Sequence, residues 1–165
     1  MIHPIVTHPD PRLREASRDV ERFDDELARL VDDMFETMRH ADGIGLAAVQ
    51  IGVMLRVAVM QVEDNPRRVM VNPSYEAVGE SMTLEEGCLS VPGVRDQTKT
   101  RSDRVRVQAL DQNGEPYEFE AEGLEAACVQ HECDHMDGHL YVDRLSTLRR
   151  RRVLKRYEQQ RETEA

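Results

Sequence analysis

The stretch Gln130-His131-Glu132-Cys133-Asp134-His135 contains the pattern H-E-x-x-H, and the rest of the chain can be arranged around it. Residues four apart in a helix lie one above the other on the same face, so His131 and His135 would direct both imidazoles to one point. That arrangement supplies the first two ligands of a tetrahedral metal site. Glu132 lies beside this point but is poorly directed to bind the metal, and it is better suited to take a proton from water.

The residues before the two histidines predict a helix with a buried face. A stripe with the helical period of 3.6 residues leads into them and consists of Leu124, Ala127, Cys128, His131 and His135. Gly123 and Gly138 stand where such a helix would begin and end. The alternative is that H-E-x-x-H occurs here by chance, with both histidines on the surface, but the rest of the chain favours the metal site.

The composition is typical of one soluble globular domain. The chain has 165 residues, of which 39% are hydrophobic and 33% charged, and with 4% aromatic residues and no Trp its core must be aliphatic. No apolar run reaches the length of a membrane span, and residues 1–10 lack the apolar region of a signal peptide. Cys88, Cys128 and Cys133 are irregularly spaced, which favours free thiols in a reducing, cytoplasmic compartment. We expect a monomer that does not associate with a membrane.

The charge is unevenly distributed along the chain. Residues 144–161 contain eight basic residues and one acid, a charge of +7, so the rest must carry −17 to give the net charge of −10. Ser146 could cap a last helix over about 146–161 that carries most of these basic residues. A solvated helix face is the ordinary explanation of such a run, whereas its contrast with an acidic body favours a binding surface.

Helical patterns at both ends of the chain enclose a middle part with strand patterns, which indicates an α+β fold. A helix is predicted over 23–40, with three acidic residues near its positive end. Predicted strands cover 55–62, 68–71, 74–78 and 81–84, and a hairpin with a turn at Asn113-Gly114 covers 104–120. We therefore predict a single domain over residues 1–165, with mixed or antiparallel strands packed around the central metal-binding helix.

Residues 43–52 imitate the fingerprint of a dinucleotide-binding loop, with glycines at 43 and 45 and Ala48. That fingerprint follows a strand and opens a long helix, whereas this segment follows a predicted helix and precedes a predicted strand, so we reject it. The glycines are better explained by a backbone that approaches a ligand closely, with the Gln50 amide at the edge of the same surface. The alternative is a glycine-rich turn with a surface Gln.

A catalytic metal site needs a third protein ligand and one open position. None of the candidates after His135 is convincing; these are Asp137, His139, Asp143 and Glu158. Upstream, Cys88 lies in the tight turn over residues 85–90, and a thiolate is a strong ligand for a divalent metal. A lone Cys is more often a small buried apolar residue, so Cys88 is a candidate only because the histidines are present.

Three segments resemble the signature motifs of the peptide deformylase family in order and spacing: G-I-G-L-A-A-V-Q at 43–50, E-G-C-L-S at 86–90 and Q-H-E-C-D-H at 130–135. The resemblance covers nearly the whole chain. It implies a metal-dependent hydrolase that removes the N-formyl group from the N-terminal formylmethionine of newly made proteins and releases formate. It also puts the substrate on the ribosome, where the C-terminal helix of some bacterial members docks, so the basic helix is a candidate ribosome contact.

The resemblance further implies roles for individual residues. Cys88, His131 and His135 would hold one divalent metal, Fe²⁺ in bacterial members, which Zn²⁺, Ni²⁺ or Co²⁺ can replace. Glu132 would act as general base and then as general acid, while the Leu89 backbone N–H and the Gln50 amide would bind the developing oxyanion. The substrate-binding residues would be Gly43, Ile44, Gly45, Leu84, Gly87, Leu124, Ala127 and Cys128.

Two departures from the family pattern affect substrate preference. Ala127 stands where many members have a larger aliphatic residue, which predicts a wider methionine pocket, and residues 96–100 are more polar than the strand that usually follows the second motif. Three other functions remain open: an HExxH metallopeptidase, a structural Cys-His-His metal site, and a deformylase-like protein with redirected activity. The first lacks a downstream third ligand, and the second lacks a fourth protein ligand.

Overall fold

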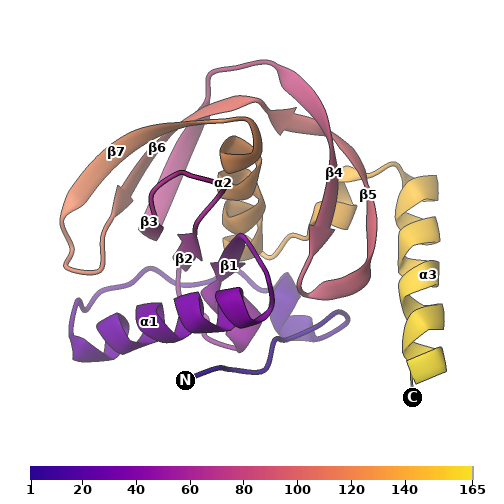
Figure 1. The fold of residues 1–165 in the computed structure, drawn as a ribbon, viewed down its shortest axis with the longest axis horizontal. Helices are drawn as coiled ribbons and strands as arrows, with labels where there is room; N and C mark the ends of the chain where they lie inside the picture. The colour runs from indigo at the N-terminus through magenta and orange to yellow at the C-terminus, as the bar shows by residue number, and fades with distance from the viewer. Residues whose placement is uncertain (165) are drawn as a thin grey trace.

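The computed structural model describes residues 1–164, and Figure 1 shows three α-helices beside two antiparallel sheets within them. The helices are α1 Asp25–His40, α2 Gly123–Met136 and α3 Thr147–Glu164, and the 3₁₀ turns are η1 Pro11–Arg14, η2 Ala48–Ile51 and η3 Tyr141–Arg144. The strands are β1 Gly45–Ala47, β2 Val57–Met60, β3 Arg68–Ala77, β4 Ser81–Cys88, β5 Val91–Ser102, β6 Arg104–Leu110 and β7 Pro116–Glu122. The predicted α+β class is confirmed.

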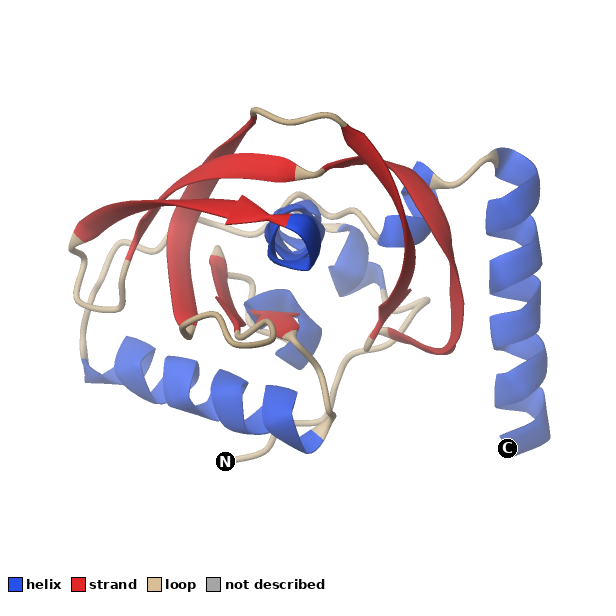
Figure 2. Ribbon diagram, turned by 45° about the horizontal axis from the view of Figure 1, so that its top comes forward, coloured by secondary structure: helices blue, strands red, loops and turns tan. Residues whose placement is uncertain are grey.

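The two sheets lie on different sides of α2. The larger sheet has the strand order β1-β2-β3-β6-β7, and the smaller one is the two-stranded ribbon β4-β5. Figure 2 shows α2 nearly end-on at the centre of the molecule, between the larger sheet and the ribbon. Residues on different faces of α2 therefore meet different sheets.

The start and the buried face of α1 both follow from local sequence. The Asp24 carboxylate accepts a hydrogen bond from the Leu27 backbone N–H at 3.1 Å and so caps the first turn. The face that packs on the larger sheet consists of Leu27, Val31, Met34, Phe35 and Met38. Successive β2 side chains point to opposite faces of that sheet. Val57 and Val59 are buried in one cluster with α1, whereas Ala58 and Met60 are buried in another cluster with α2. The predicted helix over 23–40 is confirmed, with its start at Asp25.

α2 is buried on most of its surface, including several polar side chains. Gln130 illustrates how the interior accommodates them. Its Oε1 accepts a hydrogen bond from the Ser102 backbone N–H at 2.9 Å, and its Nε2 donates to the Ser102 carbonyl at 2.8 Å. A buried polar side chain is tolerated when it has such partners, so α2 can carry charged and polar groups into the interior.

β3 continues through Asn72-Pro73 as one strand, so the predicted separation into strands over 68–71 and 74–78 is wrong. The register of its pairing with β6 shifts between Val71 and Ser74, which is a local bulge. The Asn72 side chain holds this bulge by pairing with the backbone of Val20, accepting at 2.8 Å and donating at 3.0 Å. The turn signal of Asn-Pro is thus realised as a bulge within a strand.

The ribbon is longer than the sequence pattern predicts. β4 extends beyond the predicted 81–84 to Cys88, and after a two-residue turn the chain returns as β5. This geometry places Cys88 at the tip of the ribbon, beside α2. The two segments that supply the proposed ligands are therefore brought together by the packing of the ribbon against α2.

α3 confirms the predicted C-terminal helix and runs along β5 at one side of the molecule (Figure 1). Val153 and Tyr157 are buried in one cluster with Val91 and Val94. The polar contacts to β5 are those of Arg149 with the Asp96 carboxylate at 3.1 Å, Arg156 with the Arg95 carbonyl at 3.4 Å and Gln160 with the Gly93 carbonyl at 3.1 Å. None of the helices within residues 1–164 combines membrane-spanning length with a sufficiently apolar sequence.

Candidate metal centre

The side chains of Cys88, His131 and His135 converge on one point between β4 and α2. Cys88 Sγ lies 3.3 Å from His135 Nε2, and the two histidine Nε2 atoms lie 3.2 Å apart. The three ligand atoms lie within 4.8 Å of one another. Metal bonds of about 2.1 Å to nitrogen and 2.3 Å to sulfur separate tetrahedral ligand atoms by roughly 3.4–3.6 Å. The donor set, one thiol and two imidazoles, therefore fits a single divalent transition metal.

Glu132 lies next to this point and is almost fully buried. Its Oε1 has no hydrogen-bond partner within residues 1–164, and its Oε2 lies 3.8 Å from the Cys128 thiol. Burial raises the pKa of Glu132 to about 7, because the low-dielectric interior disfavours the charged carboxylate. A carboxyl group with a free oxygen and a pKa near neutrality suits proton transfer to and from a ligand.

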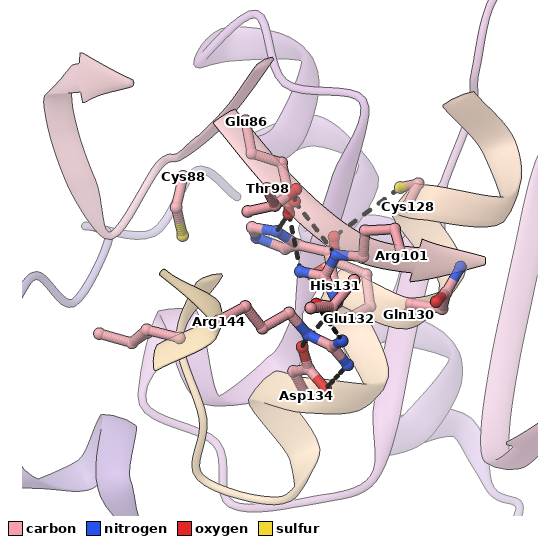
Figure 3. A network of polar contacts seen from close by, with 12 residues as sticks. Glu86, Cys88, Thr98, Arg101, Cys128, Gln130, His131, Glu132, Asp134 and Arg144 are labelled. Carbon is pink, nitrogen blue, oxygen red and sulfur yellow. Dashed lines mark hydrogen bonds and ion pairs between the residues drawn. The ribbon is translucent and has the colours of Figure 1, made fainter. Parts of the chain in front are cut away.

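Glu86 contacts the first histidine from behind, and no role was predicted for it from the sequence. Its Oε1 lies 3.0 Å from His131 Nδ1. Figure 3 shows the two side chains facing each other. Although burial opposes its charge, hydrogen bonds with His131 and Arg101 hold the pKa of Glu86 below its ordinary value. Donation of the Nδ1 proton to this carboxylate leaves His131 Nε2 free to bind a metal. The available signal was its position in the sequence, two residues before the candidate ligand Cys88.

His135 is held differently. It is fully buried, and its Nδ1 has no hydrogen-bond partner within residues 1–164. His131 is thus the one imidazole of the pair whose orientation is fixed by a carboxylate.

A cleft of about 690 Å³ opens in front of the three ligands. Its wall contains all predicted site residues except His135, namely Gly43, Ile44, Gly45, Gln50, Leu84, Gly87, Cys88, Leu89, Leu124, Ala127, Cys128, His131 and Glu132. Further wall residues that the sequence did not single out are Asp42, Glu85, Glu86, Pro92, Gly93, Val94 and Arg95. Ile44 and Leu124 are 39% and 41% exposed, so apolar side chains border the open side of the cleft.

Gly45 is required by the close approach of β1 to α2. A Cβ at this position would lie 2.4 Å from Glu132 Oε2 and 2.6 Å from Cys128 Sγ, which is too close for any side chain. The sequence predicted that a glycine here lets the backbone approach a ligand. The structure adds that the same glycine lets β1 lie directly against the Glu132 carboxylate.

Gln50 is buried, so the alternative of a surface Gln in a glycine-rich turn is wrong. Its Oε1 accepts a hydrogen bond from the Ala47 backbone N–H at 3.0 Å. Its Nε2 donates to Ser90 Oγ at 3.1 Å and lies 3.8 Å from Cys88 Sγ. With its oxygen held by Ala47, the amide directs Nε2 toward Ser90 and the Cys88 thiol of the candidate metal centre.

Comparisons with known proteins agree with these observations. The polypeptide deformylase family model matches residues 2–151. A peptide deformylase of Azotobacter vinelandii is 51% identical over 159 residues, which cover 94% of this chain and 94% of that protein. The crystal structure of a peptide deformylase from Legionella pneumophila superposes with a TM-score of 0.94 at 44% identity, covering 99% of this chain and 98% of the other. That of an Ehrlichia chaffeensis peptide deformylase in complex with actinonin gives 0.91 at 40% identity, covering 96% and 97%. The chain therefore belongs to the peptide deformylase family.

Proposed function

We propose that this chain is a metal-dependent hydrolase that removes the N-formyl group from the N-terminal formylmethionine of newly made proteins and releases formate. The observation that carries this proposal is the cluster of Cys88, His131 and His135 beside the buried Glu132 carboxylate, at the foot of a partly apolar cleft. A divalent metal held by the three ligands would polarise the formyl carbonyl and lower the pKa of water. We propose Fe²⁺ as this metal, with Zn²⁺, Ni²⁺ and Co²⁺ as substitutes.

Glu132 would move the proton that the reaction requires. Hydrolysis of an amide needs a base that takes a proton from water and an acid that protonates the departing amine. Within residues 1–164 the buried Glu132 Oε1 has no hydrogen-bond partner, so it is available for both proton transfers in turn. The other oxygen, Oε2, lies 3.8 Å from the Cys128 thiol.

Gln50 and Leu89 would stabilise the negative charge that develops on the formyl oxygen. The Gln50 amide is oriented by Ala47, and the Leu89 backbone follows Cys88 directly, so both donors flank the metal centre. Such donors act because they are already aimed at the place where charge develops. The loss of one donor typically slows turnover about 10²–10³-fold.

The methionine side chain would lie in the apolar part of the cleft. This part is formed by Ile44, Leu84, Leu124, Ala127, Cys128 and the His131 ring. A flexible thioether fills an irregular apolar space well. Gly43, Gly45 and Gly87 would let the substrate backbone approach β1 and β4 closely.

The metallopeptidase alternative has less support. Its third ligand would have to follow His135, yet two of the downstream acids already have other partners. Asp137 pairs with Arg56, and Asp143 contacts Arg14. Within residues 1–164, Cys88 is the residue that joins the two histidines.

Glu132→Ala tests the proposal directly. We expect the variant to bind one equivalent of metal and to lose activity on formyl-Met-Ala-Ser by about 10²–10⁴-fold, because a proton carrier and not a ligand is removed. Assay and metal analysis should use one anaerobic sample. Cys88→Ser is the matched comparison and should lose metal together with activity, since a soft ligand is replaced. Loss of metal from Glu132→Ala in proportion to its activity would contradict the assigned role.

We also propose that residues 1–165 form one catalytic domain that acts as a monomer in the cytoplasm and meets its substrate at the ribosome; Ala165 lies outside the described residues. The outer face of α3 supports the ribosome contact. Arg151, Arg152 and Lys155 are exposed there, beside Leu148 at 60% exposure. Such a surface suits phosphate contacts of low sequence specificity.

Charge reversal is a better test of this contact than truncation. Removal of the chain after Leu148 would also remove the buried Val153 and Tyr157, and the fold would suffer. The triple variant Arg151→Glu, Arg152→Glu and Lys155→Glu should pellet less with ribosomes and show a shallower salt dependence, while its turnover of a free formyl tripeptide stays unchanged. Equal pelleting of both proteins at every salt concentration would leave α3 as a solvated face.

A further inference from the structure

A line of alternating charges connects η3 with the metal ligand His131, as Figure 3 shows. It begins at Arg144, whose Nε and Nη2 donate to the two oxygens of Asp134 at 2.8 and 3.1 Å. Asp134 Oδ2 also accepts from Arg101 Nη1 at 2.7 Å. Asp134 therefore binds two guanidinium groups at once.

The line continues from Arg101 to the metal centre. Arg101 Nη2 donates to Glu86 Oε1 at 2.7 Å, and its Nε donates to Glu86 Oε2 at 3.1 Å. This two-point contact fixes the plane of the Glu86 carboxylate. Glu86 Oε1 in turn lies 3.0 Å from His131 Nδ1. Each member is thus oriented by the one before it.

The charged side chains become more buried from Arg144 inward to Arg101, so each inner group depends on its partners. The Arg101 side chain is 0% exposed, Glu86 8%, Asp134 13% and Arg144 25%. A buried charge that loses its partner is strongly destabilised, so Arg101 depends on both carboxylates. Arg144 is the outermost member and the one through which the line ends at solvent.

The segments joined by this line are those that carry the three ligands. Glu86 and Cys88 lie on β4, Arg101 lies on β5, and Asp134 lies between the two histidines of α2. Arg144 also donates to Thr100 Oγ1 on β5 at 3.0 Å. The charged line therefore sets how the ribbon sits against α2, and with it the spacing between Cys88 and the histidines.

We propose that Asp134 and Arg144 are positioning residues of the deformylase reaction, which hold Arg101, and through it Glu86 and His131, in the orientation needed to bind the metal. This inference rests on the proposed function. It assigns to the segment after α2 a part in the metal centre, although Arg144 is neither one of the three proposed ligands nor a residue of the cleft wall. The orienting contact acts on His131 and not on His135, because His135 Nδ1 has no hydrogen-bond partner within the described residues.

The test compares Arg144→Gln with Arg56→Gln in the full-length protein loaded with Co²⁺. Arg56 is a matched control, since its side chain is 20% exposed and binds Asp137 just after α2 at 3.0 Å. Three quantities are measured: the rate of Co²⁺ loss to a chelator, the visible absorption spectrum of the bound Co²⁺, and kcat and KM on formyl-Met-Ala-Ser.

We expect Arg144→Gln to lose Co²⁺ about tenfold faster than wild type, with an altered spectrum and a lower kcat at unchanged KM. Asp134→Asn should lose it still faster, within about 100-fold, because it weakens the hold on Arg101 directly. Arg144→Lys should restore part of the effect, since a single ammonium replaces one of the two contacts with Asp134. Arg56→Gln should match wild type in all three measurements.

Equal Co²⁺ loss and equal spectra for Arg144→Gln and Arg56→Gln would overturn the inference and leave Arg144 as an ordinary ion pair. The proposed function fails in a distinguishable way. If Cys88→Ser binds Co²⁺ as tightly and with the same spectrum as wild type, the ligand set itself is wrong, whatever Arg144 does.

Discussion

α2 meets the larger sheet and the β4-β5 ribbon through two different kinds of contact. Toward the sheet it packs apolar side chains against apolar side chains; from the sheet these include Ala58, Met60, Val105 and Val107, and from α2 they include Ala126, Val129, Cys133 and Met136. Toward the ribbon it presents Asp134 to Arg101 and His131 to Glu86, and Arg101 and Glu86 also pair with each other. The same helix is thus held by non-directional burial on one side and by directional ion pairs on the other.

The difference separates stability from geometry. Apolar burial stabilises a fold in proportion to the area removed from water and tolerates small shifts. A buried ion pair contributes little net stability compared with well-packed apolar residues, but its hydrogen bonds hold orientation closely. The proposed ligands lie on the ribbon side of α2, where these hydrogen bonds control side-chain orientation, as a metal site would require.

Arg101→Met removes the ion pairs between α2 and the ribbon, and of the variants proposed here it should have the largest effect on stability. It leaves Glu86 and Asp134 buried without their shared partner, and we expect the free energy of unfolding to fall by about 3–5 kcal/mol. Urea unfolding of the metal-free protein measures this fall. Replacing all three groups together, as Glu86→Leu, Arg101→Met and Asp134→Leu, should recover most of the stability and yet fail to restore metal binding. A triple variant as unstable as Arg101→Met would show that the ions themselves stabilise the fold.

Met70→Ala tests the apolar contact between α2 and the larger sheet, and it should lower stability without affecting metal binding. Met70 is fully buried in the apolar cluster beside α2, and its truncation should lower the free energy of unfolding by about 2–4 kcal/mol through the cavity it leaves. The rate of Co²⁺ loss from the folded variant should equal that of wild type. Faster Co²⁺ loss from Met70→Ala would mean that packing against the larger sheet also controls the geometry of the metal centre.

Ala127→Ile probes the cleft between the two sides. Ala127 is buried on α2 and lines the cleft, so the three carbons that Ile adds there should narrow the pocket. Activity on formyl-Phe peptides should fall at least roughly tenfold more than activity on formyl-Met peptides, since even one methylene group in an apolar pocket changes discrimination about tenfold or more. The measurement is the ratio of kcat/KM for the two substrates in each protein. An equal loss on both would show that Ala127 does not contact the first side chain of the substrate.

Tyr117 gives the sheet side a small dependence on alkaline pH. Its hydroxyl donates to the Val69 carbonyl, and burial raises the pKa of Tyr117 from 10.0 to about 12. Because the unfolded chain ionises first, the stabilisation by Tyr117 is complete below pH 10 and is lost as the pH rises toward 12. The difference in unfolding free energy between wild type and Tyr117→Phe should therefore shrink from pH 9 to pH 11.5. A constant difference across that range would contradict this assignment.

The elements that local patterns describe were predicted well. α1 and α2 follow the helical period, and the hairpin of β6 and β7 follows strict alternation around Asn113-Gly114. These patterns report burial on one face, which the sequence expresses within a few residues. β3 was divided wrongly because Asn72-Pro73 is a local turn signal, while the bulge that replaces the turn depends on a contact with Val20 far away in the chain.

The candidate site was predicted from motifs, and its support was not. The i,i+4 spacing indicated His131 and His135, the need for a third ligand indicated Cys88, and the family resemblance supplied the roles of Gln50 and Leu89. Arg101 and Arg144 carry no comparable signal, because each is an isolated arginine whose partners lie on other elements. Only the packing of the ribbon against α2 brings their charges together.

The contacts between α3 and β5 have a consequence for association between molecules. β5 is an outer strand of a two-stranded ribbon, and free carbonyl groups on such an edge can template the addition of another strand. Gln160 and Arg156 donate to the carbonyls of Gly93 and Arg95 and so occupy two of these acceptors. α3 therefore covers part of this edge, which should lower its tendency to pair with a strand of another molecule.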